Sequence, residues 1–214
     1  MTKEVIFILD RSGSMRGLEA DTIGGFNGLI EQQKEVEGDV FITTVLFDDA
    51  YEKLHDYTPL LEVSPLTRES YFVRGTTALL DAVGKTITQV AHRIRTQKIP
   101  HTDVLVVIMT DGMENASQEY SYEVVKTLID TYQHEAGWEF LFLGANIDAA
   151  AAAESIGIRK ERAAHFHADR QGVKTNFRGV NRAMNEFRMS AKMSESWRDE
   201  IDRDYTHRKK RNKK

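Results

Sequence analysis

Short runs of consecutive apolar residues alternate along the chain with longer stretches in which apolar residues recur every three or four positions. Continuous apolar runs are typical of strands buried on both faces of a sheet. They predict strands over residues 5–9, 40–47, 104–109, 138–143 and 163–166. After a turn at Asp48 and Asp49, residues 51–57 predict an antiparallel strand at the edge of the sheet.

Helical periodicity is clearest over residues 78–97, where Leu79, Val83 and Ile87 lie four positions apart and further apolar residues continue the stripe. The same kind of pattern predicts helices over 18–36, 121–136, 148–156 and about 173–194. Residues 58–73 contain two of the prolines and are expected to be irregular.

The alternation of strands and helices has a direct topological consequence. Strand–helix–strand units close by right-handed crossovers, which produce a mainly parallel sheet covered by helices on both faces. We therefore predict one α/β domain over residues 1–194, with one antiparallel edge strand, followed by a charged tail over 195–214.

Composition narrows the class of protein. Of the 214 residues, 41% are hydrophobic and 29% are charged, which is ordinary for a soluble globular domain. No apolar run approaches the roughly 18 residues that a membrane span requires. The chain has no cysteine, which excludes disulfides, thiolate metal sites and thiol nucleophiles. The first residues do not resemble a signal peptide, so we expect a cytoplasmic protein.

The net charge of −4 conceals an uneven distribution. The last eight residues, 207–214, hold six Lys or Arg and no acid, so the rest of the chain has 23 basic and 33 acidic residues, or −10. We expect residues 195–214 to form a disordered, solvated basic tail. A weak electrostatic contact between this tail and nucleic acid or an acidic partner is the alternative.

Oxygen-bearing side chains follow two of the predicted buried strands. Asp10, Ser12 and Ser14 alternate along the loop after the first strand, and Asp111 follows the strand over 104–109. Alternate side chains of an extended segment point the same way, so the first three can converge. In open α/β sheets, ligands bind at the carboxyl ends of the strands. These four side chains are therefore expected at one edge of the sheet.

A third loop, which enters the helix over 78–97, adds the hydroxyls of Thr76 and Thr77. All of these candidate ligands bind through oxygen, a set that favours Mg²⁺, Mn²⁺ or Ca²⁺ over Zn²⁺ or Cu²⁺. Each motif alone is common in turns and helix caps. Their combination at one sheet edge predicts a metal site.

In this order and spacing, the motifs resemble the metal-ion-dependent adhesion site (MIDAS) of von Willebrand factor type A (VWA) domains, in a bacterial or phage-type single-domain form. The first motif is Asp10-x-Ser12-x-Ser14 after a hydrophobic strand, and the last is Asp111 within residues 110–112, Thr-Asp-Gly. Residues 75–82, Gly-Thr-Thr-Ala-Leu-Leu-Asp-Ala, look like the threonine loop of the family and its following helix. The resemblance covers about residues 3–170.

The resemblance implies a Rossmann-like, three-layer αβα domain that holds a metal at the carboxyl edge of its sheet. The metal residues that it implies are Asp10, Ser12, Ser14, Thr77 and Asp111. Thr76 is the fallback for Thr77, which has the better spacing to the following helix.

By the same resemblance, the protein is a divalent-metal-dependent protein-binding module and not an enzyme. One coordination position of the metal stays open for an Asp or Glu of a partner protein. Mg²⁺ is the expected ion, and Mn²⁺ or Ca²⁺ also fit the ligand set. By analogy with bacterial relatives, the partner is expected to be an AAA+ ATPase or an assembly component, and neither a membrane nor nucleic acid.

An alternative function is a Mg²⁺-dependent hydrolase of phosphate esters, because an acidic loop at the end of a parallel strand suits phosphoryl transfer. Against it, Ser12 stands where such an enzyme would use a second carboxylate. The chain also lacks a GxxxxGK[ST] loop, a GxSxG elbow and a GxGxxG fingerprint.

Several other residues are expected to have structural roles or to lie at the rim of the site. Arg11, Met15 and Arg16 are expected to shape the partner surface beside the metal. Asp48, Asp49 and Asp148 are expected in turns or helix caps, and His165 and His167 in structural contacts. The basic stripe of the last predicted helix is expected to be solvated; it consists of Lys174, Arg178, Arg182 and Arg188.

Overall fold

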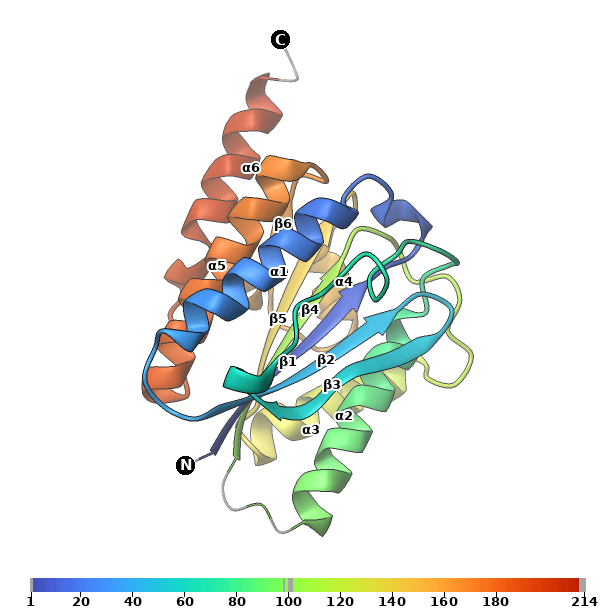
Figure 1. The fold of residues 1–214 in the computed structure, drawn as a ribbon. Helices are drawn as coiled ribbons and strands as arrows, with labels where there is room; N and C mark the ends of the chain where they lie inside the picture. The colour runs from blue at the N-terminus through green and yellow to red at the C-terminus, as the bar shows by residue number, and fades with distance from the viewer. Residues whose placement is uncertain (1, 98, 100–101, 212–214) are drawn as a thin grey trace.

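The computed structural model describes residues 2–97, 99 and 102–211, with the side chains of 210 and 211 left out. Its centre is a six-stranded sheet in the order β3-β2-β1-β4-β5-β6 (Figure 1). All neighbouring strands pair in parallel except β2 and β3. The strands are β1 (Thr2–Asp10), β2 (Val40–Phe47), β3 (Tyr51–Pro59), β4 (Thr102–Thr110), β5 (Glu139–Ala145) and β6 (Ala163–Phe166).

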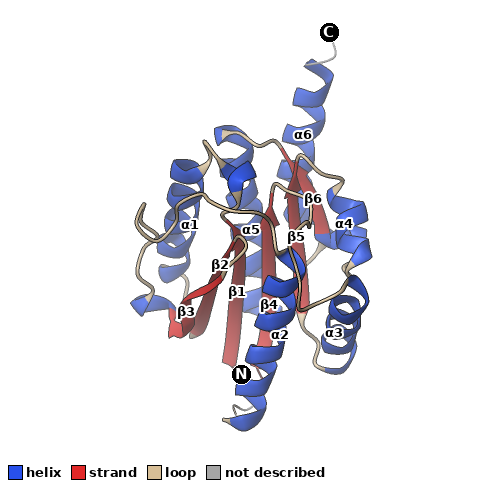
Figure 2. Cartoon of the chain, turned by 90° about the vertical axis from the view of Figure 1, so that its right-hand side faces the viewer, coloured by secondary structure: helices blue, strands red, loops and turns tan. Residues whose placement is uncertain are grey.

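Helices cover both faces of this sheet, as Figure 2 shows. One face carries α1 (Glu19–Lys34) and α5 (Arg170–Ser190), and the other carries α2 (Leu79–Thr96), α3 (Tyr122–Glu135) and α4 (Ala149–Ser155). The predicted fold class, a three-layer α/β domain with one antiparallel edge strand, is confirmed. Among the described residues, no helix is long and apolar enough to cross a membrane.

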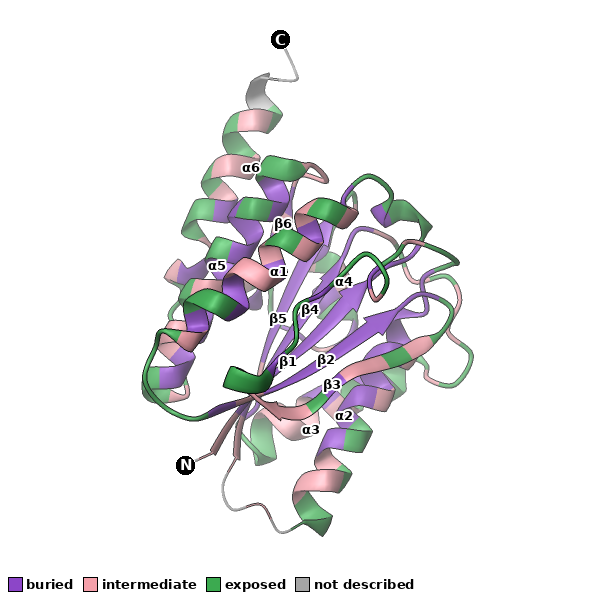
Figure 3. Cartoon of the chain, viewed as in Figure 1, coloured by how far each residue is buried: buried purple, intermediate pink, exposed green. Residues whose placement is uncertain are grey.

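The central strands are buried along most of their length, in agreement with their continuous apolar runs (Figure 3). Successive residues of β1 alternate between the two cores: Phe7 packs on the α1 and α5 side, whereas Ile6 and Ile8 pack on the α2 and α3 side. On the first side α1 approaches α5 closely, because a Cβ on Gly25 would lie 2.2 Å from the ring of Phe177. Glycine at this position therefore sets the spacing of the two helices.

The strand order places the switch point of the topology between β1 and β4. From β1 the chain moves outward through α1 to β2, and from β3 it returns through α2 to β4 on the other side of β1. The loops that leave β1 and β4 therefore diverge, and in open α/β sheets ligands bind at the carboxyl ends of the strands at such a point. The first motif follows β1 and the last follows β4.

The predicted disordered tail over 195–214 is wrong for its described part. A 3-10 helix (Glu195–Arg198) and a further α-helix, α6 (Asp199–Arg211), follow α5. Trp197 and Ile201 are buried in the α1 and α5 core, and Tyr205 stacks on His165 and His167 of β6 and the loop after it. These few contacts hold an otherwise charged helix against the domain. The sequence did not predict them, because isolated apolar residues among many charged ones form no clear helical stripe.

The prediction of a solvated basic stripe on α5 is wrong for Arg188. Its guanidinium is largely buried and donates to the backbone carbonyls of Gln33, Val36, Glu37 and Gly38. These carbonyls lie at the C-terminal end of α1 and just after it, where a helix leaves acceptors unpaired. Arg188 thus caps the C-terminal end of α1, which lies more than 150 positions earlier in the chain.

Candidate metal centre

Asp10 is the last residue of β1, and its side chain is fully buried. Its Oδ1 accepts from the Ser12 backbone N–H at 2.7 Å, and its Oδ2 accepts from the Thr110 hydroxyl at 2.6 Å. Burial raises the pKa of Asp10 to about 6, although the hydrogen bond from Thr110 opposes that shift. Both oxygens are thus held in fixed positions at the carboxyl end of the strand.

Three hydroxyls from two loops meet beside this carboxylate. The Thr77 hydroxyl donates to Ser12 Oγ at 2.9 Å, and Ser12 Oγ lies 3.1 Å from Ser14 Oγ. Gly112 marks the point where they converge. A Cβ on Gly112 would lie 3.0 Å from Ser14 Oγ, 3.0 Å from Thr77 Oγ1 and 3.9 Å from Ser12 Oγ. A side chain at position 112 would therefore crowd the cluster, which explains the glycine.

Asp111 supplies the second carboxylate and is also buried. Among the described residues, neither of its oxygens has a hydrogen-bond partner. Burial raises the pKa of Asp111, and the nearby Ser14 hydroxyl opposes that shift. An unpaired buried carboxylate is costly unless a cation or a donor compensates it. Asp111 is therefore the clearest sign that the cluster fits a bound cation.

No Lys, Arg or His among the described residues pairs with Asp10 or Asp111, and the negative charge of Asp111 raises the pKa of Asp10 further. Nor do the described residues hold a cluster of three or more His, Asp or Glu that could bind a metal. A cation here would have two carboxylates and three hydroxyls as ligands. That all-oxygen set suits a hard divalent ion.

All five predicted metal residues, Asp10, Ser12, Ser14, Thr77 and Asp111, therefore lie at one place. The structure also separates the two candidate threonines: the side chain of Thr77 is buried in the cluster, whereas Thr76 is exposed. Whether these side chains ligate a metal stays a prediction.

Residues outside the predicted set hold the cluster in position. The Tyr71 hydroxyl donates to the Asp10 backbone oxygen at 2.5 Å, and Asn115 Oδ1 accepts from the Thr77 backbone N–H at 2.9 Å. Glu114 accepts from the backbone N–H of Leu80 in the first turn of α2. The role of Tyr71 could not be predicted from the sequence, because Tyr71 lies in the segment over 58–73, which has no periodic pattern.

The expectation that Arg11 and Met15 face a partner is wrong. Both side chains are fully buried; Arg11 pairs with Asp48, and Met15 packs in the core with α1 and α5. Arg16 is exposed, as expected. Asp148 caps α4 by accepting from the Ala151 N–H, which confirms the predicted cap.

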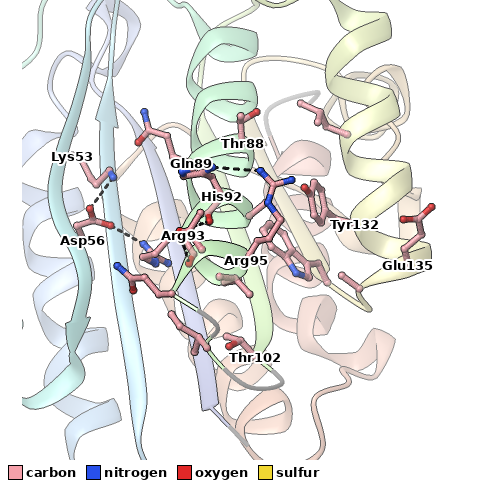
Figure 4. Close-up of a pocket in the computed structure, with 18 residues that line it drawn as sticks. Lys53, Asp56, Thr88, Gln89, His92, Arg93, Arg95, Thr102, Tyr132 and Glu135 are labelled. Carbon is pink, nitrogen blue, oxygen red and sulfur yellow. Dashed lines mark hydrogen bonds and ion pairs between the residues drawn. The ribbon is translucent and has the colours of Figure 1, made fainter.

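A cavity of about 960 Å³ lies at the opposite end of the sheet between α2, α3 and β3 (Figure 4). Three of the charged side chains on its wall form ion pairs. Asp56 pairs with Lys53 and Arg93, and Arg93 also pairs with Glu4. This part of the wall therefore presents paired charges, in contrast to the cluster at the carboxyl end.

No protein-family model matches the chain, and no curated protein matches it. Solved structures match its fold. Proximal thread matrix protein 1 from the mussel byssus is 15% identical, with a TM-score of 0.56, over 84% of this chain and 45% of that one. A von Willebrand factor type A protein from Catenulispora acidiphila is 16% identical, with a TM-score of 0.57, over 84% and 42%.

A third similar structure is the ArnB paralog VWA2 from Sulfolobus acidocaldarius, 18% identical, with a TM-score of 0.53, over 82% of this chain and 43% of that one. The chain thus spans less than half the length of each of these structures. The mussel protein has also been solved with a zinc-occupied MIDAS motif. At these identities the likeness shows the fold, which is that of VWA domains.

Proposed function

We propose that the chain is a divalent-metal-dependent protein-binding module, which holds Mg²⁺ between Asp10, Ser12, Ser14, Thr77 and Asp111. The observation that carries the proposal is the unpaired, buried carboxylate of Asp111 beside three converging hydroxyls and a second buried carboxylate. The zinc-occupied MIDAS motif of the mussel protein supports a divalent ion in this fold. Mg²⁺ is our choice because it takes oxygen ligands and retains waters.

The role of the bound ion is to receive a carboxylate from a partner. Neutral hydroxyl ligands leave much of the positive charge of the ion uncompensated, so an incoming Asp or Glu is favoured. The proposed partner is a protein, such as an AAA+ ATPase or an assembly component. The site would bind and not catalyse, and a cytoplasmic location, which the cysteine-free composition favours, belongs to the same proposal.

The test is calorimetric titration of Mg²⁺, Mn²⁺, Ca²⁺ and Zn²⁺ into metal-free protein, beside Asp10→Ala and Asp111→Asn variants. We expect saturable binding to the wild type that both variants lose while their circular dichroism stays unchanged. A pull-down from lysate with and without chelator then shows whether partner capture depends on the metal. Equal binding by the wild type and both variants, or none by any of them at millimolar metal, would overturn the proposal.

A further inference from the structure

Arg11, the residue between Asp10 and Ser12, is fully buried although it carries a charge. Its Nε lies 3.0 Å from Asp48 Oδ2, and its Nη1 lies 2.7 Å from Glu52 Oε2. Its Nη2 has no hydrogen-bond partner in the part of the chain that the structure describes. A buried guanidinium with an unpaired nitrogen contributes little to stability, because desolvation offsets much of the attraction between the charges. A contribution to fold stability therefore does not explain why the ion pair between Arg11 and Asp48 is buried at this position.

Asp48 joins three segments of chain that surround the proposed metal site. Its side chain is as buried as that of Arg11, and Oδ2 accepts a second ion pair from Arg74 Nε at 2.7 Å. Its Oδ1 accepts from the Ala50 N–H, and its backbone oxygen accepts from the Ala78 N–H. Burial alone would raise the pKa of Asp48, but the hydrogen bond from Arg74 and the other donors hold it below its usual range. The carboxylate is thus charged at neutral pH.

Backbone contacts transmit this arrangement to the hydroxyl ligands. The Arg74 N–H donates to the Arg11 oxygen at 3.0 Å, and the Gly13 N–H donates to the Gly75 oxygen at 3.1 Å. The Phe72 ring lies against both guanidinium groups, 5.3 Å from that of Arg11 and 5.1 Å from that of Arg74. Backbone hydrogen bonds and the Phe72 ring therefore hold the loop that carries Ser12 and Ser14 against the loop that carries Thr77.

We infer that Arg11 and Asp48 are positioning residues, which fix the distance between the serine loop and the threonine loop and so make the site selective for Mg²⁺ over Ca²⁺. The inference rests on the proposed metal-binding function. Mg²⁺ demands a nearly ideal octahedron of ligands, whereas Ca²⁺ accepts longer and less regular coordination. A site with loosened loops consequently loses Mg²⁺ affinity more than Ca²⁺ affinity.

The experiment compares wild type, Arg11→Met and Asp48→Asn by calorimetric titration with Mg²⁺ and, separately, Ca²⁺. Methionine fills the space of the arginine stem, and Asp48 keeps its ion pair with Arg74. We expect Mg²⁺ affinity to fall by about 10- to 100-fold, the usual effect of removing a group that orients metal ligands. Ca²⁺ affinity should fall less, so that the ratio of the two affinities shifts toward Ca²⁺. Glu52→Gln changes a half-exposed partner of Arg11 and should give a smaller shift in the ratio of Mg²⁺ to Ca²⁺ affinity. This variant tests the inference if Arg11→Met and Asp48→Asn do not fold.

Arg162→Met is the matched control. Arg162 is likewise buried and paired with a carboxylate, Glu139, but at the start of β5 and thus at the opposite edge of the sheet. This variant should lose stability in chelator without a change in the ratio of metal affinities.

Equal factors of loss for the two ions in Arg11→Met, or unchanged affinities, would overturn the positioning role while the proposed function stands. Failure of the wild type to bind any divalent metal would instead overturn the proposed function, and this inference with it.

Discussion

Strand β1 carries a buried carboxylate near each of its ends, and the two have opposite surroundings. Glu4, near the start of the strand, accepts from Arg93 through both oxygens and from the Thr43 hydroxyl at 2.6 Å. Asp10, at the end, accepts two hydrogen bonds from neutral groups and meets no cation among the described residues. Both lie on the α2 side of the sheet, because six positions separate them and side chains alternate along a strand.

The comparison shows how to distinguish a structural from a functional buried acid in this fold. Burial raises the pKa of both groups, with desolvation as the largest cause. At Glu4 the protein supplies its own compensating cation. At Asp10, with Asp111 beside it, no cation of the described residues compensates the charge. A raised pKa alone therefore does not mark a candidate metal site, whereas the lack of a cation among the described residues does.

The largest expected effect is on stability at the paired end. Arg93→Met leaves Glu4 buried without its cation, and we expect the free energy of unfolding to fall by about 3–5 kcal/mol, the usual cost of breaking a buried pair from one side. Urea denaturation measures it. The double variant Glu4→Gln/Arg93→Met should recover much of the loss, and metal affinity should stay at the wild-type value in both. A loss of metal affinity in these variants would mean that the two ends are not independent.

At the carboxyl end of β1 we expect removal of the Asp10 charge to stabilise the metal-free protein and to weaken metal binding. Asp10→Asn should lower metal affinity by about 100-fold or more, which is about 2.8 kcal/mol or more on the scale of tenfold per 1.4 kcal/mol. The same variant should make the metal-free protein more stable, because a neutral amide is cheaper to bury than a carboxylate. Calorimetry and urea denaturation in chelator measure the two effects. A metal-free variant less stable than the wild type would contradict the comparison.

The pH dependence should follow from the pKa of Asp10, which is raised to about 6. Metal binding requires the charged carboxylate, so affinity should be constant well above pH 6 and fall about tenfold per pH unit below it, or 1.36 kcal/mol. Stability of the metal-free protein should change in the opposite sense. Because the folded state binds the proton more tightly than the unfolded state, the contribution of Asp10 rises as pH falls through 6.

The Asp10→Asn variant is the control for that slope. Its metal-free form should lack the part of the pH dependence that Asp10 causes between about pH 4 and 6. If wild type and variant have the same pH dependence of unfolding, the carboxylate is already charged at these pH values and the assigned pKa is wrong.

The smallest effect separates two adjacent threonines. Thr77→Val removes a buried hydroxyl, one of the proposed ligands, without a change in size. We expect metal affinity to fall by about tenfold, which is at least the loss seen when a group that only orients a ligand is removed. Thr76→Val changes an exposed side chain and should leave it unchanged. Isothermal titration of the two variants in parallel is sufficient. Equal losses would indicate that this loop contributes through its backbone geometry and not through the Thr77 hydroxyl.

The sequence by itself determined the layers of the fold and the edge on which the site lies. Apolar runs and helical stripes are local patterns, so they predicted each strand and the helices α1 to α5 close to their observed bounds. Four of the candidate metal residues could also be placed, because Asp10, Ser12, Ser14 and Asp111 lie at or just after strand ends and parallel strands present these ends at one edge of the sheet. Asp10 and Asp111 are 101 positions apart and could be placed together on topology alone.

Only the tertiary structure decided how individual charged residues are used. Arg11 and Arg188 looked like solvent-facing charges, yet both are buried, because their partners at Asp48 and at the end of α1 lie far away in the chain. The helix α6 was hidden for the same reason: Trp197 and Ile201 reach a core built by other segments. A local pattern records what a residue prefers, whereas burial of a charge depends on which distant group pairs with it.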